Sequence, residues 1–506
     1  MTAAPGKRHR TLRLTVAGSL ILAARLRAAP ASGEPETPET ADGGSSVAAP
    51  AEPNFHFFGE PDATTADQPP KKRFWLAAGE VVFINLLPWL YGRFIVDDPI
   101  ARVGPSTWAR NFEHLPDLYR TFDRDSILVN QVAHPGLSGS FYFNAARSNG
   151  YDFWGSVPWA LVGSFAWETF GETEKPDIGD VTSTFLGGVN WGEITYRSSR
   201  MLLDNEATGF TRVLREVGGL VLDPAGAMTR LLTGDMFRTG PNPPDRFPSR
   251  LTAVLDVGYR RRGNEDPDHS NQALVAGELR YGDPFEGSLL KPFDVFQVSG
   301  EFAQPSSTLV TRFEAYGFLA EGDLSSQPRS EHRLAFLLGY DYQNSLNRVY
   351  QDEWLGLRFL SRLALGGRAF FLTDLGIGAV PLAAMESDYP QQNAAEPYPY
   401  MSIGTTIGRN YDYAPGGTAE VAARVRQDET DLVEVGYTLS LVHSVNGIAR
   451  DSRVQGAFAE GRLPLSGGLS AGAGWNWDER LTTYETLHSL RHSASEWRIF
   501  ASWTLR

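Results

Sequence analysis

The sequence predicts an antiparallel membrane β-barrel that follows a mainly α-helical N-terminal module. Three observations support this fold class. Residues 248–506 alternate apolar and polar side chains with a period of two, which is the signature of strands. The 51 glycines and 12% aromatic residues suit many tight turns and aromatic girdles at a membrane surface. Residues 73–235 instead show helical spacing, which sets the module apart from the barrel.

The alternation is clearest in four stretches of the C-terminal part. Their apolar residues share one strand face: Leu251, Ala253, Leu255, Val257 and Tyr259; Ala273, Val275, Gly277, Leu279 and Tyr281; Val433, Val435, Tyr437, Leu439 and Leu441; Trp497, Ile499, Ala501, Trp503 and Leu505. Runs of about 10 residues can cross a bilayer as tilted strands, whereas soluble strands average about five to six. We therefore expect about 12 spanning strands. A soluble β-sandwich or up-and-down barrel is the alternative, because the pattern does not say which face is inside.

The N-terminal 31 residues are typical of an export signal. Lys7, Arg8, Arg10 and Arg13 form a basic region, residues 14–24 are apolar, and residues 29–31 offer small residues for cleavage. Residues 32–72 are rich in Pro, Ala and Glu and predict a disordered linker. Export together with the barrel predicts a bacterial outer-membrane location, with outer-membrane lipid as the partner.

Composition excludes several classes of site. The chain has no cysteine, and its nine histidines form neither a HExxH nor a His-x-His pattern, so no metal site and no cofactor are predicted. The net charge of −14 argues against nucleic acid as a partner. The oligomeric state stays open.

The module at 73–235 contains three helices that the sequence delimits well. Residues 74–96 are strongly apolar but are interrupted by Glu80, Asn85 and Pro88, which favours an amphipathic helix lying on a membrane or on the barrel. Residues 139–149 predict a helix that Gly150 ends. A further helix follows Asp223 as N-cap and ends at Gly234.

Polar or small side chains line one face of the 139–149 helix and one face of the helix that follows it, and we expect these two faces to lie opposite each other. Ser140, Asn144 and Arg147 share one face of the 139–149 helix. The next helix carries a stripe of small residues that ends at Glu168, and we expect Arg147 to pair with Glu168 or Glu172. The full predicted polar network is His134, Asn144, Arg147, Asn149, Glu168, Glu172, Asp180 and Glu193.

The strings that carry these residues resemble a known family. "NQVAHPGLSGSFYFNAARSNGYDFWGS", "GSFAWETFGETEKPDIGD" and "GGVNWGEITYRSS" are similar, in this order, to the signature of bacterial envelope proteins with the domain of unknown function 3943. The resemblance covers about residues 75–235. The chain departs from it at Gly136, where an aromatic residue is expected, and at residues 177–180. The resemblance implies an envelope setting and no established reaction.

Three hypotheses for the polar residues follow. A lipid or lipopolysaccharide hydrolase would use His134 as general base, Ser138 or Ser140 as nucleophile, and Glu168 or Glu172 to orient the imidazole. No G-x-S-x-G motif supports it. The same residues could form a structural polar core, or line a transport conduit with the module as plug. The sequence favours the two non-enzymatic hypotheses together over the enzyme.

Overall fold

The computed structural model describes residues 55–56, 71–122, 126–243, 245–263, 270–286, 291–306, 309–345, 348–389 and 411–505. The predicted signal peptide lies outside the described residues, as does nearly all of the predicted linker, so both stay predictions.

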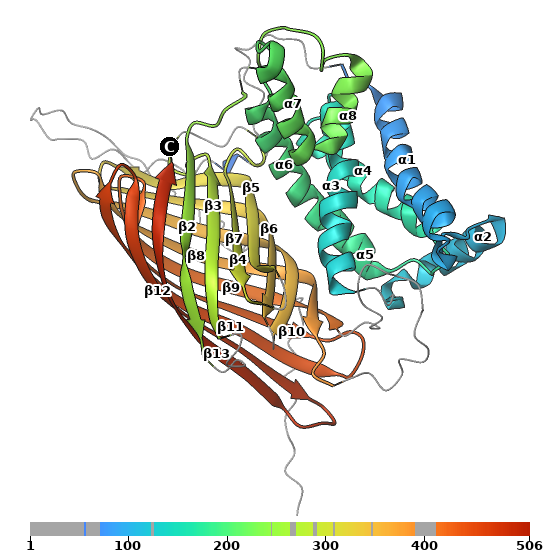
Figure 1. Cartoon of the computed structure of the whole chain (residues 1–506). Coiled ribbons are helices and arrows are strands. Elements are labelled where there is room, and N and C mark those ends of the chain that lie inside the picture. The colour runs from blue at the N-terminus through green and yellow to red at the C-terminus, as the bar shows by residue number, and fades with distance from the viewer. Residues whose placement is uncertain are drawn as a thin grey trace, which may run out of the picture. The chain divides into compact units, whose positions relative to one another are not determined.

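The described part of the chain contains twelve strands that close into an antiparallel barrel (Figure 1). They are β2 (Leu251–Arg262), β3 (Asn271–Tyr281), β4 (Phe296–Gln304), β5 (Val310–Gln327), β6 (Ser330–Ser345), β7 (Arg348–Gly366), β8 (Ala369–Glu386), β9 (Tyr411–Gln427), β10 (Thr430–His443), β11 (Arg450–Ser466), β12 (Leu469–Tyr484) and β13 (Leu490–Leu505).

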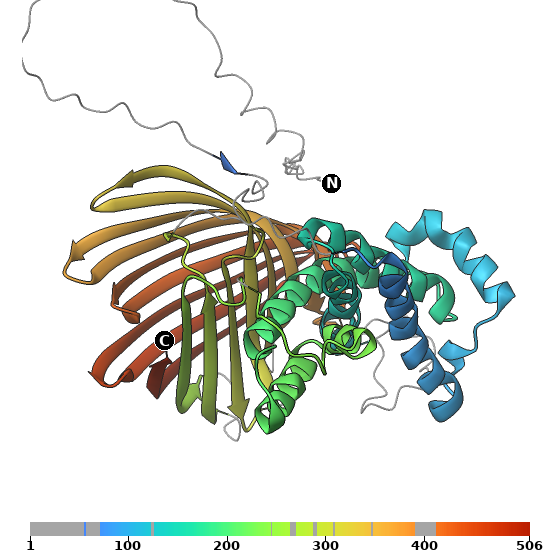
Figure 2. The ribbon, with the colours of Figure 1, turned by 90° about the horizontal axis from the view of Figure 1, so that it is seen from above.

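Two pairings close the barrel. Each strand pairs with its neighbours in the chain, β13 pairs back onto β2, and β5 pairs with β6. Figure 2 shows the strand wall after a turn of 90°. Two-residue connections join β5 to β6, β7 to β8, β9 to β10 and β11 to β12, all at the same end of the barrel. Closure gives every barrel strand a partner on both sides, as a sheet inside a membrane requires, although β5 extends past the end of β4 at Gly317.

The outward face of the barrel is apolar and the inward face is polar. On β2, Leu255 and Val257 are 43% and 44% exposed, whereas Asp256 and Arg260 between and after them are 9% and 1% exposed. On β13 the predicted apolar face is outward as well, with Trp497 67% exposed. A soluble barrel has the opposite arrangement. The predicted fold class is therefore confirmed, and the polarity settles which face is inside.

The helices form a second group, in which α3 contacts α1, α4, α6 and α8 (Figure 1). The helical segments, with 3-10 turns at η3 and η4 and π-helical geometry at the other η segments, are α1 (Phe74–Tyr91), η2 (Gly92–Val96), η3 (Pro99–Ala101), α2 (Pro105–His114), η4 (Leu115–Arg120), η5 (Val129–Gly139), α3 (Ser140–Ser148), α4 (Phe153–Ala166), η6 (Trp167–Gly171), α5 (Ile178–Thr182), η7 (Ser183–Gly187), α6 (Gly188–Leu202), α7 (Gly209–Leu222) and α8 (Pro224–Thr233).

The predicted ends of α3 and α8 are confirmed. The chain leaves α3 through Gly150, whose φ of 89° suits a residue without a Cβ. Asp223 precedes α8 and accepts a hydrogen bond from Gly226 N at 2.8 Å, and Gly234 ends α8 with a φ of 78°.

Two observations bear on the sequence-based expectations. Helix α1 with η2 forms a segment, Phe74–Val96, that by length and composition alone could cross a membrane, whereas the sequence favours an amphipathic helix lying on a membrane or on the barrel. Its Glu80 is buried against other helices, so the interruption does not face the outside. Phe55–His56, inside the predicted linker, forms the short strand β1 on β5. It pairs beyond Gly317, where β4 no longer covers that edge.

Candidate functional site: the polar core, the seam and the lumen

Two fully buried asparagines lie at the centre of the helical group, one on α3 and one directly after it. Asn144 donates to Thr195 Oγ1 on α6 and to Asp223 Oδ1 ahead of α8, each at 3.1 Å. Asn149, just after α3, donates to Glu80 Oε2 on α1 at 2.7 Å. Because a buried amide is stable only when it is hydrogen-bonded, these two residues fix α3 against three other helices.

The ion pair at the end of α3 differs from the one we expected. Arg147 forms a bidentate pair with Glu193 on α6, with Nε–Oε2 at 2.6 Å and Nη2–Oε1 at 2.8 Å. The expected pairing of Arg147 with Glu168 or Glu172 is therefore wrong. Helical spacing identified the polar face of α3, but it could not say that α6, rather than the end of α4, lies opposite that face. Arg197 also binds Glu193, at 2.8 Å.

The two buried carboxylates next to α3 have different electrostatics. Burial alone raises the pKa of Glu193, but the guanidinium groups of Arg147 and Arg197 outweigh burial and hold that pKa below its usual value. Burial also raises the pKa of Asp223, to about 6, and the hydrogen bonds from Gly226 N and Asn144 offset it only in part. Asp223 therefore gives up its proton less readily than an ordinary aspartate.

Glu168, Glu172 and Asp180 lie in a separate corner of the module. Glu168 Oε2 accepts a hydrogen bond from the backbone N–H of Asp177 at 2.9 Å. Asn111 on α2 donates to the carbonyl oxygens of Glu168 and Glu172, at 3.2 and 3.1 Å. Both glutamates are buried. The hydrogen bonds from Asn111 join α2 to η6 and to the chain that follows it.

The proposed general base and one proposed nucleophile have hydrogen-bond or ionic partners other than each other. His134 Nδ1 lies 3.4 Å from Thr184 Oγ1, and His134 Nε2 lies 3.8 Å from Asp180 Oδ2. Burial lowers the pKa of His134 to about 4, so the imidazole is neutral. Ser140 Oγ donates to the carbonyl of Gly136 at 2.5 Å. Within the described residues no hydrogen bond joins His134 to Ser138 or Ser140, and the hydrolase hypothesis stays a prediction.

A polar seam joins η5 to tyrosines of β6 and β9. Asn130 Nδ2 donates to Tyr411 Oη at 2.9 Å, and Gln131 Nε2 donates to Tyr413 Oη at 3.2 Å. Tyr340 on β6 donates to the carbonyl oxygen of Gln131. All five residues are buried, and none was predicted from the sequence.

Helix α6 makes further contacts with the barrel strands. Asn190 Nδ2 donates to the carbonyl oxygen of Ala315 on β5 at 3.0 Å, and the ring of Trp191 lies 4.8 Å from that of Phe313. Arg197 Nη1 lies 2.9 Å from Asp294 Oδ1, just before β4. The contacts thus run across the wall from Asp294, just before β4, to the seam tyrosines at the start of β9.

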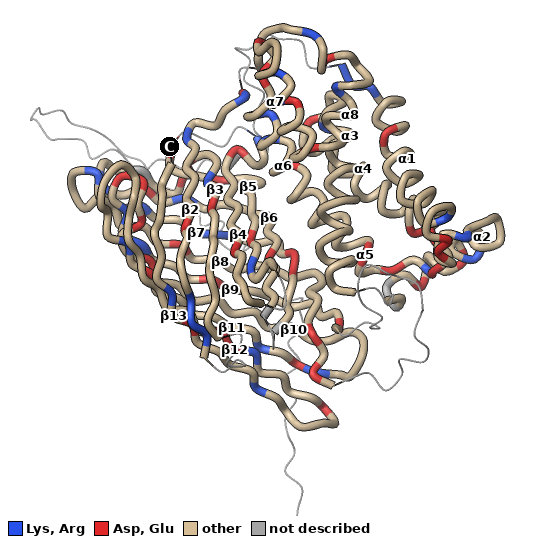
Figure 3. Tube along the Cα trace, viewed as in Figure 1, with Lys and Arg blue, Asp and Glu red and all other residues tan. Residues whose placement is uncertain are grey.

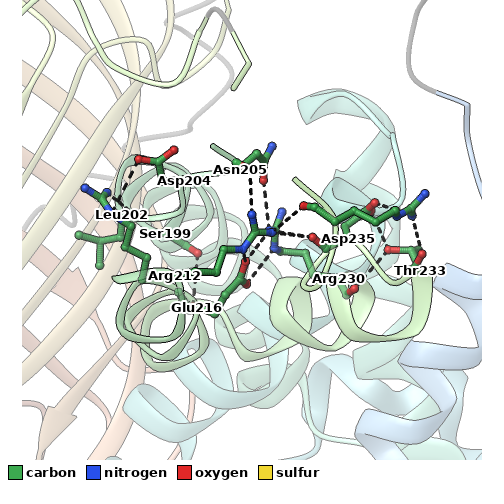
Figure 4. Close-up of polar contacts among 12 residues, drawn as sticks. Ser199, Leu202, Asp204, Asn205, Arg212, Glu216, Arg230, Thr233 and Asp235 are labelled. Carbon is green, nitrogen blue, oxygen red and sulfur yellow. Dashed lines mark hydrogen bonds and ion pairs between the residues drawn. The ribbon is translucent and has the colours of Figure 1, made fainter. Parts of the chain in front are cut away.

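A charged clamp holds the ends of α7 and α8 together (Figure 4). Glu216 lies between Arg212, at 3.2 Å, and Arg230, at 2.6 Å. Arg212 also donates to the carbonyl oxygens of Asn205 and Asp235, each at 2.9 Å. The charges of α7 therefore point toward neighbouring chain segments and are satisfied there.

Charged residues are spread over the barrel strands (Figure 3), and inside the barrel arginines form ion pairs with carboxylates of other strands. Pairs between strands include Arg498–Glu460 at 2.7 Å and Arg358–Glu420 at 2.6 Å. A larger set of inward ion pairs joins Arg260 to Glu301 and Glu496, Arg462 to Asp256 and Glu460, and Arg424 to Glu434.

Some of these bonds cross the lumen. Gln343 on β6 donates to Asp478 on β12 at 3.2 Å, although five strands separate β6 from β12 in either direction round the barrel. Arg312 on β5 lies 3.6 Å from the same carboxylate. Nearer the short turns, Arg280 on β3 lies 2.6 Å from Asp431 on β10. A hollow with a cavity volume of about 290 Å³ is lined by residues of the first crossing point, Gln343, Asp478 and Arg312.

The structure thus defines a closed antiparallel barrel with a polar interior, of the kind found in outer-membrane proteins. Residues 120–225 match the family described as "Domain of unknown function (DUF3943)". The match confirms the predicted resemblance over a shorter segment than the expected 75–235. No curated protein matches the chain.

Solved structures resemble the barrel half. OmpT, an outer membrane protein of Vibrio cholerae, is 8% identical with a TM-score of 0.22, covering 51% of this chain and 97% of that chain. The NanC porin is 11% identical with a TM-score of 0.22, covering 50% and 100%. The KdgM porin is 8% identical with a TM-score of 0.20, covering 50% and 99%. These likenesses concern the fold alone.

Proposed function

We propose that this chain is an outer-membrane barrel whose lumen conducts small polar solutes. The observation that carries the proposal is the hollow of about 290 Å³, lined by charged side chains of both signs. An interior lined by charged side chains stays hydrated, because water and polar solutes supply the hydrogen bonds that these side chains need and that an apolar core could not supply. The crossing bonds at Asp478 and Asp431 narrow the lumen, so we expect passage only of small solutes.

The outer-membrane location follows from the polarity of the wall. Outward residues such as Val435, Leu441 and Ile499 are apolar and exposed, and water would be a poor solvent for that surface. Hydrocarbon is a good solvent for that surface. Among structures built from strands, closed barrels and not open sheets can cross the hydrocarbon layer. The short turns at one end are typical of the periplasmic side of such barrels.

In this proposal the helical module packs against the outer wall and leaves the lumen free. Its contacts with Phe313, Ala315 and Tyr413 support this arrangement, because the hollow is lined instead by barrel residues such as Arg312 and Glu314. The plug hypothesis has no such support. The role of the module is then structural, and its buried polar network holds the helices together.

Conductance across a planar bilayer tests the conduit. The purified full chain should form channels, and Asp478→Ala should raise their conductance, because it removes the bonds to Gln343 and Arg312 that cross the lumen. Asp451→Ala is the matched control. Its side chain is 78% exposed at the start of β11, so its conductance should equal that of the wild type.

Two outcomes would contradict the proposal. One is folded, inserted protein that conducts no ions in either the wild type or Asp478→Ala. The other is an equal change in Asp451→Ala, because the effect could not then come from the crossing point.

A further inference from the structure

Helix α7 has its polarity reversed relative to a helix on the surface of a soluble protein. Two of its three charged residues, Arg212 and Glu216, are 8% and 7% exposed and belong to the clamp of Figure 4. The third, Arg215, has a side chain that is 38% exposed and donates to the carbonyl oxygen of Leu202. The exposed face of α7 instead carries large apolar side chains: Phe210, Val213, Leu214, Val217, Leu220 and Val221, the last 75% exposed. A soluble amphipathic helix turns its apolar stripe inward and its charges outward.

Helix α1 shows the same reversal. Its one acidic residue, Glu80, is 2% exposed and accepts hydrogen bonds from Thr229 and Asn149. Its exposed residues include Trp75, at 84%, and a run of apolar side chains: Val82, Phe83, Leu86, Leu87 and Leu90. In Figure 3 most of α1 and α4 is tan, whereas charged positions gather around α2 and near the ends of α7 and α8.

We infer that the exposed apolar faces of α1 and α7 lie in the acyl chains of the membrane that the barrel crosses, so that lipid, and not water, surrounds the helical module. This inference rests on the outer-membrane barrel of the proposed function. Continuity with the barrel wall is the argument that selects lipid over a protein partner.

The helices replace lipid on part of that wall. Phe153 of α4 stacks on Phe293 with ring centroids 5.5 Å apart, and Trp191 of α6 packs on Phe313, whose neighbours in the strand, Arg312 and Glu314, face the lumen. The remaining outward wall carries residues such as Leu441 that meet lipid. An element seated on a lipid-facing wall borders the same lipid on its other sides. Apolar residues on those sides and polar residues within are what that position requires.

Fluorescence quenching by lipid tests the inference. The chain has no cysteine, so one introduced cysteine can carry a bimane label without background. Val217→Cys and Val221→Cys report on α7, Leu441→Cys reports on the barrel wall, and Arg238→Cys reports on a polar position that is 65% exposed. The full chain is placed in phosphatidylcholine vesicles with brominated acyl chains. Two α7 positions are used so that the failure of one variant to fold leaves the other.

The expected result is loss of most of the fluorescence at both α7 positions and at Leu441, with little loss at Arg238. Quenching at Leu441 alone would overturn the inference while leaving the barrel in the membrane. If the unlabelled α7 cysteines then react with a water-soluble thiol reagent, water covers that face. If they do not, another protein or a second copy of this chain covers it. Absence of quenching at Leu441 as well would instead overturn the proposed outer-membrane barrel.

Discussion

The barrel and the helical module both bury charge and expose apolar surface, but they use buried charge differently. In the lumen, charged residues surround a hollow, and residues such as Arg312 and Glu314 face open space. In the module, Arg147 and Glu193 are locked in a bidentate pair, and the side chain of Glu193 is fully buried. Buried charge alone therefore does not identify a functional site. Open space next to the charged side chains distinguishes a conduit from a structural network.

The largest expected effect comes from stranding a charge in the module. Glu193→Gln should cost about 3–5 kcal/mol, because it leaves Arg147 buried without a carboxylate. Folded yield and thermal unfolding in detergent measure it. Adding Arg147→Gln to Glu193→Gln should recover part of the loss, since it removes the stranded charge. Arg197→Gln is the control with a smaller cost, because Glu193 keeps Arg147. A double variant no better than Glu193→Gln would show that the pair is not the source.

A comparable test addresses the barrel wall. Leu439→Arg should cost about 2–4 kcal/mol if this side chain points into lipid near mid-membrane. Ser440→Arg, on the adjacent residue, should be milder because Ser440 lines the hollow. Chemical unfolding from lipid vesicles compares the two variants. Equal losses, or a greater loss at Ser440, would reverse our assignment of inside and outside on β10.

A smaller effect should depend on pH. Burial raises the pKa of Asp223 to about 6 from 3.8, so the folded state holds this proton more tightly than the unfolded chain does. The stability from this group is therefore complete below about pH 4 and is lost as pH rises through 6. Asp223→Asn keeps the oxygen that caps α8 and removes the titration. Relative to the wild type it should gain at most about 3 kcal/mol at pH 8, at 1.36 kcal/mol per pKa unit.

The measurement is thermal unfolding of both proteins at pH 4 and pH 8. His134 titrates in the same range but is present in both proteins, so its effect cancels from the difference. A gain of equal size at both pH values would mean that ionisation of Asp223 does not cause it.

Local patterns predicted the strands and several helix ends well, because those features depend on residues close together in the chain. Period-two alternation placed Leu255 and Trp497 on the apolar face of their strands, and the Asp223 and Gly234 signals located α8. Neither signal depends on which elements become neighbours. The expected strand number was also confirmed.

The partners of the buried polar residues were predicted less well, for a physical reason. Whether Arg147 meets Glu168 or Glu193 depends on how helices pack, and one sequence does not contain that information. The seam residues Asn130 and Gln131 gave no local signal either, because their partners, Tyr411 and Tyr413, lie about 280 residues away. A cluster of amides in an otherwise apolar helical segment is the one clue that could have drawn attention to them.

The central claim is that the wall of the barrel meets lipid while its inner face lines a wet lumen, and a cysteine scan along β10 tests it most directly. Single cysteines at residues 433–442 are labelled with bimane, and the quenching of each label is measured in vesicles with brominated lipid. The unlabelled form of each variant is tested separately for its reactivity toward a water-soluble thiol reagent. We predict quenching at Val435, Leu439 and Leu441, and reagent access at Glu434 and Ser440, in strict alternation. Alternation in the opposite phase, or water access at every position, would contradict the account.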